Sequence, residues 1–176
     1  MIVPQHRNPR INSRLNPRIN SAINPLINSS LNPILNSNIN PILNSAINPI
    51  LNSAINPILN SAINPILNSA INPIINTSIN PLVNSRVNPN LNVNFPGEYI
   101  FDWNTLVPVG VAIRATELVK VLFDVNLRVC GYVVRANHDV GVWFDKHAKR
   151  LGEWVANGSG GSNIYNIKSQ VVGLTS

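Results

Sequence analysis

Residues 40–71 read NPILNSAINPILNSAINPILNSAINPILNSAI, an octad repeated four times without change between Asn40 and Ile71. The pattern extends in both directions, with an asparagine at every fourth position from Asn8 to Asn92. Proline alternates with serine or threonine after these asparagines, and an aliphatic residue precedes each of them from Asn12 onward. A strict short period over half of a chain is typical of repeat proteins, in which neighbouring units stack to bury a continuous core.

The repeat is incompatible with an α-helix. Proline recurs at every eighth position from Pro9 to Pro89 and would interrupt a helix about every two turns. A period of four also drifts by roughly 40° per repeat against the helical period of about 3.6, so no apolar face persists. Disorder is disfavoured because disordered chains are poor in the aliphatic residues that this repeat contains throughout.

A β-solenoid with four-residue sides satisfies the pattern. Asparagine suits the corners because it tolerates left-handed backbone conformations, and the next residue opens a short strand. The aliphatic residue before each asparagine is then expected to point inward, and asparagines of successive coils to stack into ladders. Coils of three or of four sides are possible, and the octad favours four. We therefore predict a mainly β fold: a short-repeat β-solenoid over residues 1–94, followed by a small α+β domain over residues 95–176.

In this respect the Asn-Pro/Ser-x-aliphatic repeat resembles the pentapeptide-repeat proteins, whose chains wind into square β-solenoids. The resemblance covers residues 8–92 and concerns architecture only. The period here is four or eight and not five, and that family's A-(D/N)-L-x-x pattern is absent. The resemblance implies inward aliphatic side chains, and it transfers neither a partner nor an activity.

The third position of each four-residue unit changes from polar at both ends of the repeat to apolar in the middle. Six isoleucines occupy it at octad spacing: Ile34, Ile42, Ile50, Ile58, Ile66 and Ile74. Strand alternation places this position outside, although short corners could turn it inward. If exposed, these side chains form an apolar patch that soluble monomers rarely carry. We therefore predict a non-enzymatic structural or assembly protein, a solenoid rod that forms a homo-oligomer through its aliphatic faces or its coil ends. These six isoleucines are its candidate self-association surface.

Charge is distributed unevenly along the chain. Residues 1–94 carry five charged side chains, all arginine, whereas all seven acidic residues lie after residue 94. Four of the arginines cluster near the N-terminus: Arg7, Arg10, Arg14 and Arg18. They are candidates either for contact with nucleic acid or another polyanion, or for a solvated cap at the end of the repeat.

Residues 95–176 have the composition of an ordinary small domain. Alternating apolar residues predict strands near 99–103, 107–113 and 127–134, and a final strand over 164–172. Residues 142–156 are predicted to be helical, and 116–123 fit either a helix or a strand. Because an open solenoid end needs a cover, this domain is expected to act as a cap or connector.

Few side chains of this second part suggest chemistry. His138-Asp139 with Asp145 and His147 matches no metal-ligand spacing, and Cys130 fits a packed strand residue better than a nucleophile. The sequence therefore predicts no catalytic, metal or cofactor site. A lone cysteine, and the lack of a signal-like apolar run or a membrane span, lead us to expect a cytoplasmic protein.

Overall fold

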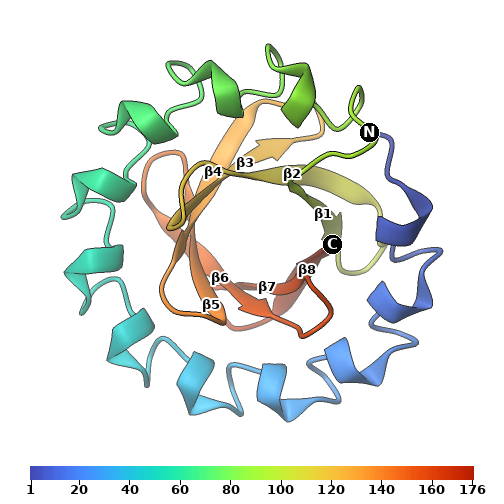
Figure 1. Cartoon of the computed structure of the whole chain (residues 1–176). Coiled ribbons are helices and arrows are strands. Elements are labelled where there is room, and N and C mark those ends of the chain that lie inside the picture. Colours follow the sequence, from blue (N-terminus) through green and yellow to red (C-terminus); the bar gives the residue numbers. More distant parts are fainter.

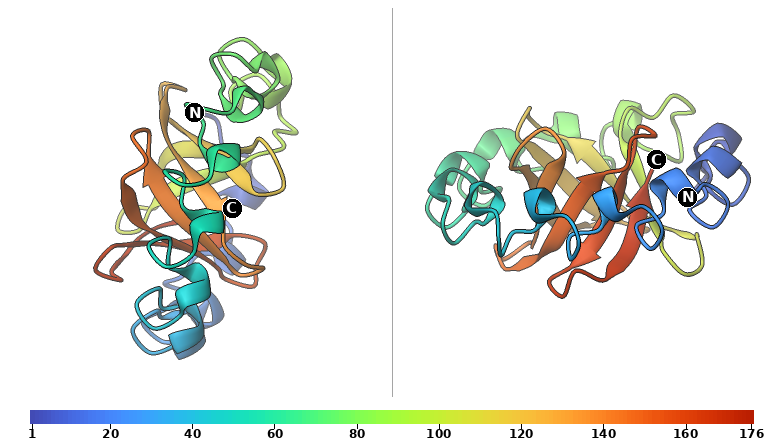
Figure 2. Two further views of the ribbon diagram at one scale, coloured as in Figure 1. Left: turned by 90° about the vertical axis from the view of Figure 1, so that its left-hand side faces the viewer. Right: turned by 90° about the horizontal axis from the view of Figure 1, so that it is seen from below.

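The computed structural model describes residues 1–176 and shows a closed β-barrel inside a ring of short helical turns (Figure 1). We call the ring, residues 5–94, the belt. The belt circles the barrel once, and its two ends meet beside the N-terminus (Figure 1). Seen from the side, the ends of the barrel project on both sides of the belt (Figure 2).

The belt contains eleven 3-10 helices of three residues each, spaced one octad apart. They are η1 (Gln5–Arg7), η2 (Ser13–Leu15), η3 (Ser21–Ile23), η4 (Ser29–Leu31), η5 (Ser37–Ile39), η6 (Ser45–Ile47), η7 (Ser53–Ile55), η8 (Ser61–Ile63), η9 (Ser69–Ile71), η10 (Thr77–Ile79) and η11 (Ser85–Val87). A second tight turn, which begins at Asn-Pro, separates each helix from the next and completes the octad.

Asparagine side chains hold these turns together. The side-chain oxygen of Asn52 accepts a hydrogen bond from the backbone N–H of Ala54 (3.1 Å) and caps η7. The side-chain amide of the same residue donates to the carbonyl oxygen of Ala46, six residues earlier (2.6 Å). One amide thus joins two successive turns. Aspartate could not make both bonds, because a carboxylate cannot donate, and this explains asparagine before every 3-10 helix from Asn12 to Asn84. The asparagines before proline accept in the same way, but only Asn32, Asn64, Asn80 and Asn88 also donate to an earlier turn.

The belt packs on the barrel through one aliphatic residue and one proline per octad. The buried aliphatic residues all close a 3-10 helix. They are Ile23, Leu31, Ile39, Ile47, Ile55, Ile63, Ile71 and Ile79. The aliphatic residues of the proline turns point away from the barrel and are exposed. The octad, rather than the four-residue unit, is therefore the structural repeat of the belt.

Eight antiparallel strands form the barrel, and each pairs with its sequence neighbours until β8 closes onto β1. The strands are β1 (Glu98–Asp102), β2 (Pro108–Arg114), β3 (Val119–Asp124), β4 (Val129–Arg135), β5 (Val140–Asp145), β6 (Arg150–Ala156), β7 (Ser162–Asn166) and β8 (Val171–Thr175).

The barrel consists of four similar hairpins, which repeat every 21 or 22 residues. The first strand of each hairpin ends in an aromatic residue followed by Asp or Asn, namely Phe101-Asp102, Phe123-Asp124, Phe144-Asp145 and Tyr165-Asn166. A glycine near the start of the second strand completes the pattern: Gly110, Gly131, Gly152 and Gly173. At Gly152, with φ +155°, a Cβ atom would lie 1.8 Å from the carbonyl oxygen of Tyr165. Only glycine permits this approach, at the point where the register between β5 and β6 shifts by a β-bulge.

Both faces of the barrel wall are apolar. Leu122 points inward and joins a small luminal core with Val133, Trp154 and Ile164. Its neighbours in β3 point outward, where belt isoleucines cover the barrel surface; Ile55, Ile63 and Ile71, for example, pack in one cluster with residues of β3, β4 and β5. The belt and the barrel therefore share a core, and neither part buries its apolar face alone.

Arg7 closes the belt. Its guanidinium donates hydrogen bonds to the carbonyl oxygens of Phe95 (3.0 Å) and Gly97 (2.6 Å) and to the main-chain oxygen of Ser176. The hydroxyl of Ser176 donates back to the carbonyl oxygen of Arg7 (2.6 Å), and the Arg7 guanidinium lies 4.8 Å from the centre of the Tyr99 ring. This arginine fastens the start of the belt to its end and to the last strand.

The predicted β-solenoid is wrong. Residues 1–94 contain no strand, and the belt makes a single circuit, so no coil stacks on another and no asparagine ladder forms. The asparagines before the 3-10 helices are extended, with φ between −86° and −116° from Asn20 to Asn84, and they cap local turns instead of forming left-handed corners. The prediction that every aliphatic residue before an asparagine points inward is wrong for half of them. Ile47 is fully buried, whereas Leu51 is 67% exposed.

The predicted α+β domain is also wrong. Residues 142–156 form β5, a tight turn and β6, and not a helix. The single strand expected over 164–172 is the end of β7, a turn and the start of β8. The error has a physical cause: a strand buried on both faces reads as a continuous apolar run, as in Val142-Trp143-Phe144, and loses the alternation that identifies a strand.

Candidate functional site

An exposed band of aliphatic side chains, which we call the aliphatic rim, follows the outside of the belt. Eight consecutive proline turns contribute two side chains each, 61–83% exposed. They are Leu26, Ile27, Ile34, Leu35, Ile42, Leu43, Ile50, Leu51, Ile58, Leu59, Ile66, Leu67, Ile74, Ile75, Leu82 and Val83. The six isoleucines predicted for self-association all belong to the rim, which also includes the residue after each of them.

The turn chemistry of the belt explains why the rim exists. In each proline turn the proline faces the barrel, and the two following residues form the tip. The intervening serine turns carry small residues at their tips, such as Ser45 and Ala46. Exposed tips around the belt therefore alternate between two large aliphatic residues and two small ones.

The arginines gather where the belt closes. Arg10, Arg14 and Arg18 follow the Arg7 junction, and Arg86 precedes it on the other end of the belt (Figure 1). Arg18 donates to the carbonyl oxygen of Asn104, whereas Arg10, Arg14 and Arg86 are exposed and have no acidic partner. The sequence offered four arginines as candidates for polyanion contact or an end cap. Arg7 stabilises the fold through its hydrogen bonds, and the other three form, together with Arg86, what we call the basic sector of the belt.

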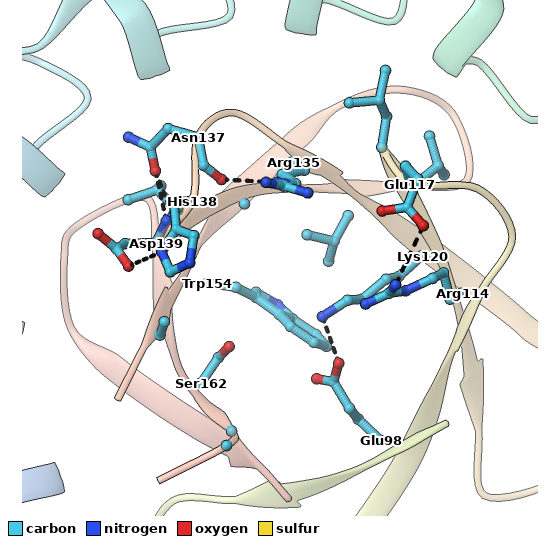
Figure 3. Close-up of a pocket in the computed structure, with 18 of the residues that line it drawn as sticks. Glu98, Arg114, Glu117, Lys120, Arg135, Asn137, His138, Asp139, Trp154 and Ser162 are labelled. Atoms are coloured by element: carbon cyan, nitrogen blue, oxygen red, sulfur yellow. Dashed lines mark hydrogen bonds and ion pairs between the residues drawn. The ribbon is translucent and has the colours of Figure 1, made fainter. Parts of the chain in front are cut away.

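A cavity of about 490 Å³ opens at one end of the barrel, among the loops that connect the hairpins (Figure 3). Trp154 lies across its floor and is only 3% exposed. The ammonium group of Lys120 lies 5.9 Å from the centre of the Trp154 ring and forms an ion pair with Glu98, with 2.5 Å between Nζ and Oε1. Arg114, Arg135 and His138 stand along the edge.

Several polar atoms at this end lack a partner. Glu98 Oε2 and Trp154 Nε1 are buried and form no hydrogen bond. The guanidinium of Arg135 donates only to the carbonyl oxygen of Asn137, through Nε at 3.3 Å. Glu98 Oε2 and Trp154 Nε1 are covered by protein atoms and do not face the open space of the cavity, whereas the exposed Arg135 does.

The other end of the barrel holds a smaller, apolar pocket of about 160 Å³, which includes Cys130 and Trp143. Cys130 itself is exposed, and partial desolvation raises the pKa of its thiol to about 11, with a smaller contribution from Asp124. At neutral pH the sulfur is therefore a protonated thiol and a poor nucleophile.

The remaining polar residues considered from the sequence do not form one site. His138 and Asp139 pair with each other on the loop before β5 (2.7 Å), whereas Asp145 and His147 lie in the turn after it, at the opposite end of the barrel. Nowhere do three or more His, Cys, Asp or Glu side chains come together in a way that could hold a metal ion.

Comparison with family models, curated proteins and solved structures finds no match to this chain. The resemblance to pentapeptide-repeat proteins therefore stays untested. None of the helices, each three residues long, could span a membrane.

The cavity was missed in the sequence because its walls come from residues far apart in the chain, such as Glu98 and Lys120. The signal that could have found it is the hairpin repeat of an aromatic residue, Asp or Asn, and glycine. Aligning the four copies places four residues at equivalent positions: Glu98, Lys120, Gly141 and Ser162. Each is the first or second residue of the first strand of its hairpin, so all four lie at one end of the barrel.

Proposed function

We propose that the protein is a non-enzymatic structural or assembly protein, which self-associates through the aliphatic rim. The size of the rim supports this proposal. Full burial of one aliphatic side chain removes roughly 60–120 Å² from water, so sixteen side chains at about two-thirds exposure present on the order of 600–1,300 Å². This total, spread over tips that the serine turns separate, equals or exceeds the largest contiguous apolar patch of a typical monomer, about 300–600 Å².

A second copy of the same chain is the partner that best suits the rim. Its tips recur at the octad interval, and every copy presents the same interval, so the aliphatic tips of one copy can alternate with those of another. A standard interface takes about 800 Å² from each partner, of which little more than half is apolar, so an arc of the rim together with its intervening serine turns can supply it. Because the rim follows the belt over eight turns, one neighbour covers only part of it, and we expect more than two copies to assemble.

The test replaces Ile42, Ile50, Ile58 and Ile66 with lysine and measures mass in solution by light scattering at high micromolar concentration. The parent protein should be an oligomer and the variant a monomer with an unchanged thermal transition. A matched control places lysine at Ala46, Ala54, Ala62 and Ala70, which are exposed at the neighbouring serine turns of the same arc. The control should remain an oligomer. A parent protein that is monomeric under these conditions would overturn the proposal.

The basic sector supports a second candidate function, binding of nucleic acid or another polyanion. The specific observation is that Arg10, Arg14 and Arg86 come from both ends of the belt, are exposed and lack acidic partners. Replacement of these three with alanine should abolish retention on heparin, and the affinity of the parent protein for DNA should fall steeply with salt. Absence of retention by the parent protein at low salt would leave Arg7 and its neighbours with a structural role only. We also propose that the protein is located in a reducing compartment such as the cytoplasm, because Cys130 has no disulfide partner.

A further inference from the structure

The apolar pocket of about 160 Å³ lies at the end of the barrel where a tight turn joins the two strands of each hairpin. We call this end the turn end. We propose that the pocket binds a medium-chain carboxylic acid, with the hydrocarbon tail inside the lumen and the carboxylate among the turns. The aliphatic rim lies outside the belt, so this inference is independent of the assembly proposed above.

The pocket lies on the axis of the barrel. All eight strands contribute to its wall, from Ile100 in β1 to Val172 in β8. Ten of the lining residues are hydrophobic, and the other two are glycines, Gly110 and Gly173, which have no side chain to fill the space. An eight-stranded barrel is just wide enough to be filled by its own side chains or to hold one small ligand. The position of the pocket therefore suits a single ligand that lies along the axis.

The burial of the lining residues shows where the pocket opens. Trp154 and Ile164 are 3% and 4% exposed, whereas Val109 and Val172 are 45% and 36% exposed, and Cys130 is exposed as well. The three exposed residues are each the second residue of a strand that follows a turn, namely β2, β4 and β8. A ligand therefore enters from the turn end and stops at Trp154, which also lines the larger cavity beyond.

The size and polarity of the pocket define the tail of the ligand. An apolar cavity of about 150 Å³ stays dry and binds benzene, so a pocket of about 160 Å³ holds a chain of about six carbon atoms. No charged, hydroxyl or amide side chain lines the pocket, and the protonated thiol of Cys130 behaves as a small hydrophobic group. Water inside finds almost no side-chain partner, and a hydrocarbon tail displaces it favourably.

The turns around the mouth define the head group of the ligand. Four exposed cations lie in or next to these turns and form no ion pair: Arg128, Lys146, Lys149 and Lys168. Three carboxylates lie in the same turns, but the Oδ1 atom of each already accepts hydrogen bonds from its own turn: Asp102, Asp124 and Asp145. Unpaired donors thus remain for an anion, whereas a cation would find acceptors that are already in use. A tail that fills the pocket leaves its carboxylate at the mouth, among these cations.

Isothermal titration of the full chain with butanoate, hexanoate, octanoate and decanoate tests the length of the tail. Affinity should rise about fourfold per methylene group from butanoate to hexanoate, because each added group is buried. It should level off from octanoate onward, because the rest of a longer chain extends beyond the pocket. No binding of hexanoate up to about 10 mM overturns the proposal, as does a rise that continues to decanoate, which is expected at an open surface such as the rim.

The head group is tested with hexanol and hexylammonium, which carry the same tail as hexanoate. Both should bind at least about threefold more weakly than hexanoate, since exposed charges contribute modestly to affinity. Hexylammonium that binds as tightly as hexanoate would overturn the assignment of an anionic head.

Cys130 is the lone cysteine, so its modification by iodoacetamide reports whether the mouth of the pocket is occupied. Hexanoate at about four times its dissociation constant should slow this modification about fivefold, because only the unoccupied fraction reacts. An unchanged rate of modification would show that the acid binds elsewhere and would overturn the proposal.

A matched pair of variants locates the tail independently. Val109→Phe narrows the mouth and should weaken hexanoate at least about tenfold. Val107→Phe, two residues earlier, is the control, because Val107 is similarly exposed (42%) but does not line the pocket. Both sites are exposed, so both variants should keep the thermal transition of the parent protein. Val172→Phe repeats the test from β8, and unchanged affinity in both Val109→Phe and Val172→Phe would contradict binding in the lumen.

Discussion

The belt and the barrel are both repeats, and they are stabilised in opposite ways. The belt repeats every eight residues, and its turns close through hydrogen bonds between residues two to seven positions apart. The barrel repeats every 21 or 22 residues, and its backbone bonds join whole strands across the sheet. Local bonds form the turns of the belt, and a few long-range bonds, such as those of Arg7, fix it on the barrel, whereas pairing between strands forms the barrel itself.

The difference also shows that each part depends on the other to cover its apolar residues. The belt has no sheet and no core of its own, and its buried isoleucines are covered only by the outer face of the barrel. The barrel in turn has an apolar outer face that only the belt covers. Apolar residues on the inner side of the belt therefore act in folding, while those of the aliphatic rim are free for another purpose. Four substitutions can sharpen or break this distinction, in order of decreasing effect.

The largest effect is expected from placing a charge on the inner side of the belt. Ile47→Asp buries a carboxylate against the barrel, where Ile47 is fully buried, and should lower the free energy of unfolding by about 4 kcal/mol or more. Leu51→Asp, four residues later, should have almost no effect because Leu51 is exposed on the rim. Chemical denaturation of the two variants compares them directly. Equal destabilisation would show that the two sides of the belt do not differ as described.

Next comes a change in the bonds that shape the turns. Asn64 is 7% exposed, accepts from the N–H of Ile66 (2.9 Å) and donates to the carbonyl oxygen of Pro57 (2.9 Å). Asn64→Asp loses the donor and introduces a buried charge, so stability should fall by about 3 kcal/mol. Asn90→Asp is the control, since Asn90 is exposed at a turn tip and only its backbone is bonded. A thermal transition of Asn64→Asp that matches the control would contradict the role assigned to the amide.

A smaller loss is expected at the closure of the belt. Arg7→Ala removes the hydrogen bonds to Phe95, Gly97 and Ser176 and should cost about 2 kcal/mol. Hydrogen exchange should speed up first in η1 and in the residues before β1. Arg14→Ala, at an exposed arginine of the basic sector, should leave both measurements unchanged. Unaltered exchange in Arg7→Ala would mean that the belt stays closed without it.

The smallest effect is a gain in stability. Glu153 is 1% exposed, and it occupies the position that Val111, Tyr132 and Leu174 fill in the other hairpins. Desolvation raises the pKa of Glu153, although its ion pair with Arg150 opposes the shift. Because the folded state then binds the proton more tightly than the unfolded one, stability falls as pH rises from the ordinary carboxyl pKa toward the raised value.

Replacing the whole ion pair, with leucine at both Arg150 and Glu153, should therefore stabilise the protein by about 1–2 kcal/mol at pH 7, and this gain should shrink as the pH approaches about 4. Unfolding curves at both pH values measure it. The exposed Glu117, replaced by alanine, serves as the control and should show no gain at either pH. A loss of stability in the double variant at neutral pH would show that the attraction within the ion pair outweighs its desolvation.

The sequence was sufficient to predict the strict repeat, the change at residues 94–97 and the contrast between arginine ends and an aliphatic middle. The belt could have been derived from local chemistry, since an asparagine before proline or serine caps a tight turn through its own side chain. The β-solenoid was preferred because a core was expected inside the repeat. Nothing in the octad says that Ile47 is covered by residues more than 80 positions later, such as Val140 and Val155.

The barrel and its cavity depend on distant pairing to an even greater extent. The strands β1, β2 and β4 lie within two residues of the predicted ranges, because their apolar runs are short and bounded by turns. In β5 and β6 both faces of the strand are buried, so apolar and polar residues do not alternate and the strands could not be recognised from the sequence. The pairing of Glu98 with Lys120, and the placement of Trp154 between the two ends of the lumen, follow only from closure of the barrel.

Because Arg7 closes the belt, the perimeter of the barrel limits how long the belt can be. Short tandem repeats in a gene gain or lose copies readily when replication slips, and an open array would tolerate either change. In this protein the perimeter of the barrel is set by its eight strands, and the belt must return to Phe95 and Gly97 after one circuit. An added or missing octad would leave Arg7 out of reach of these carbonyl groups. The perimeter of the barrel thus fixes the number of octads that the closed belt can hold.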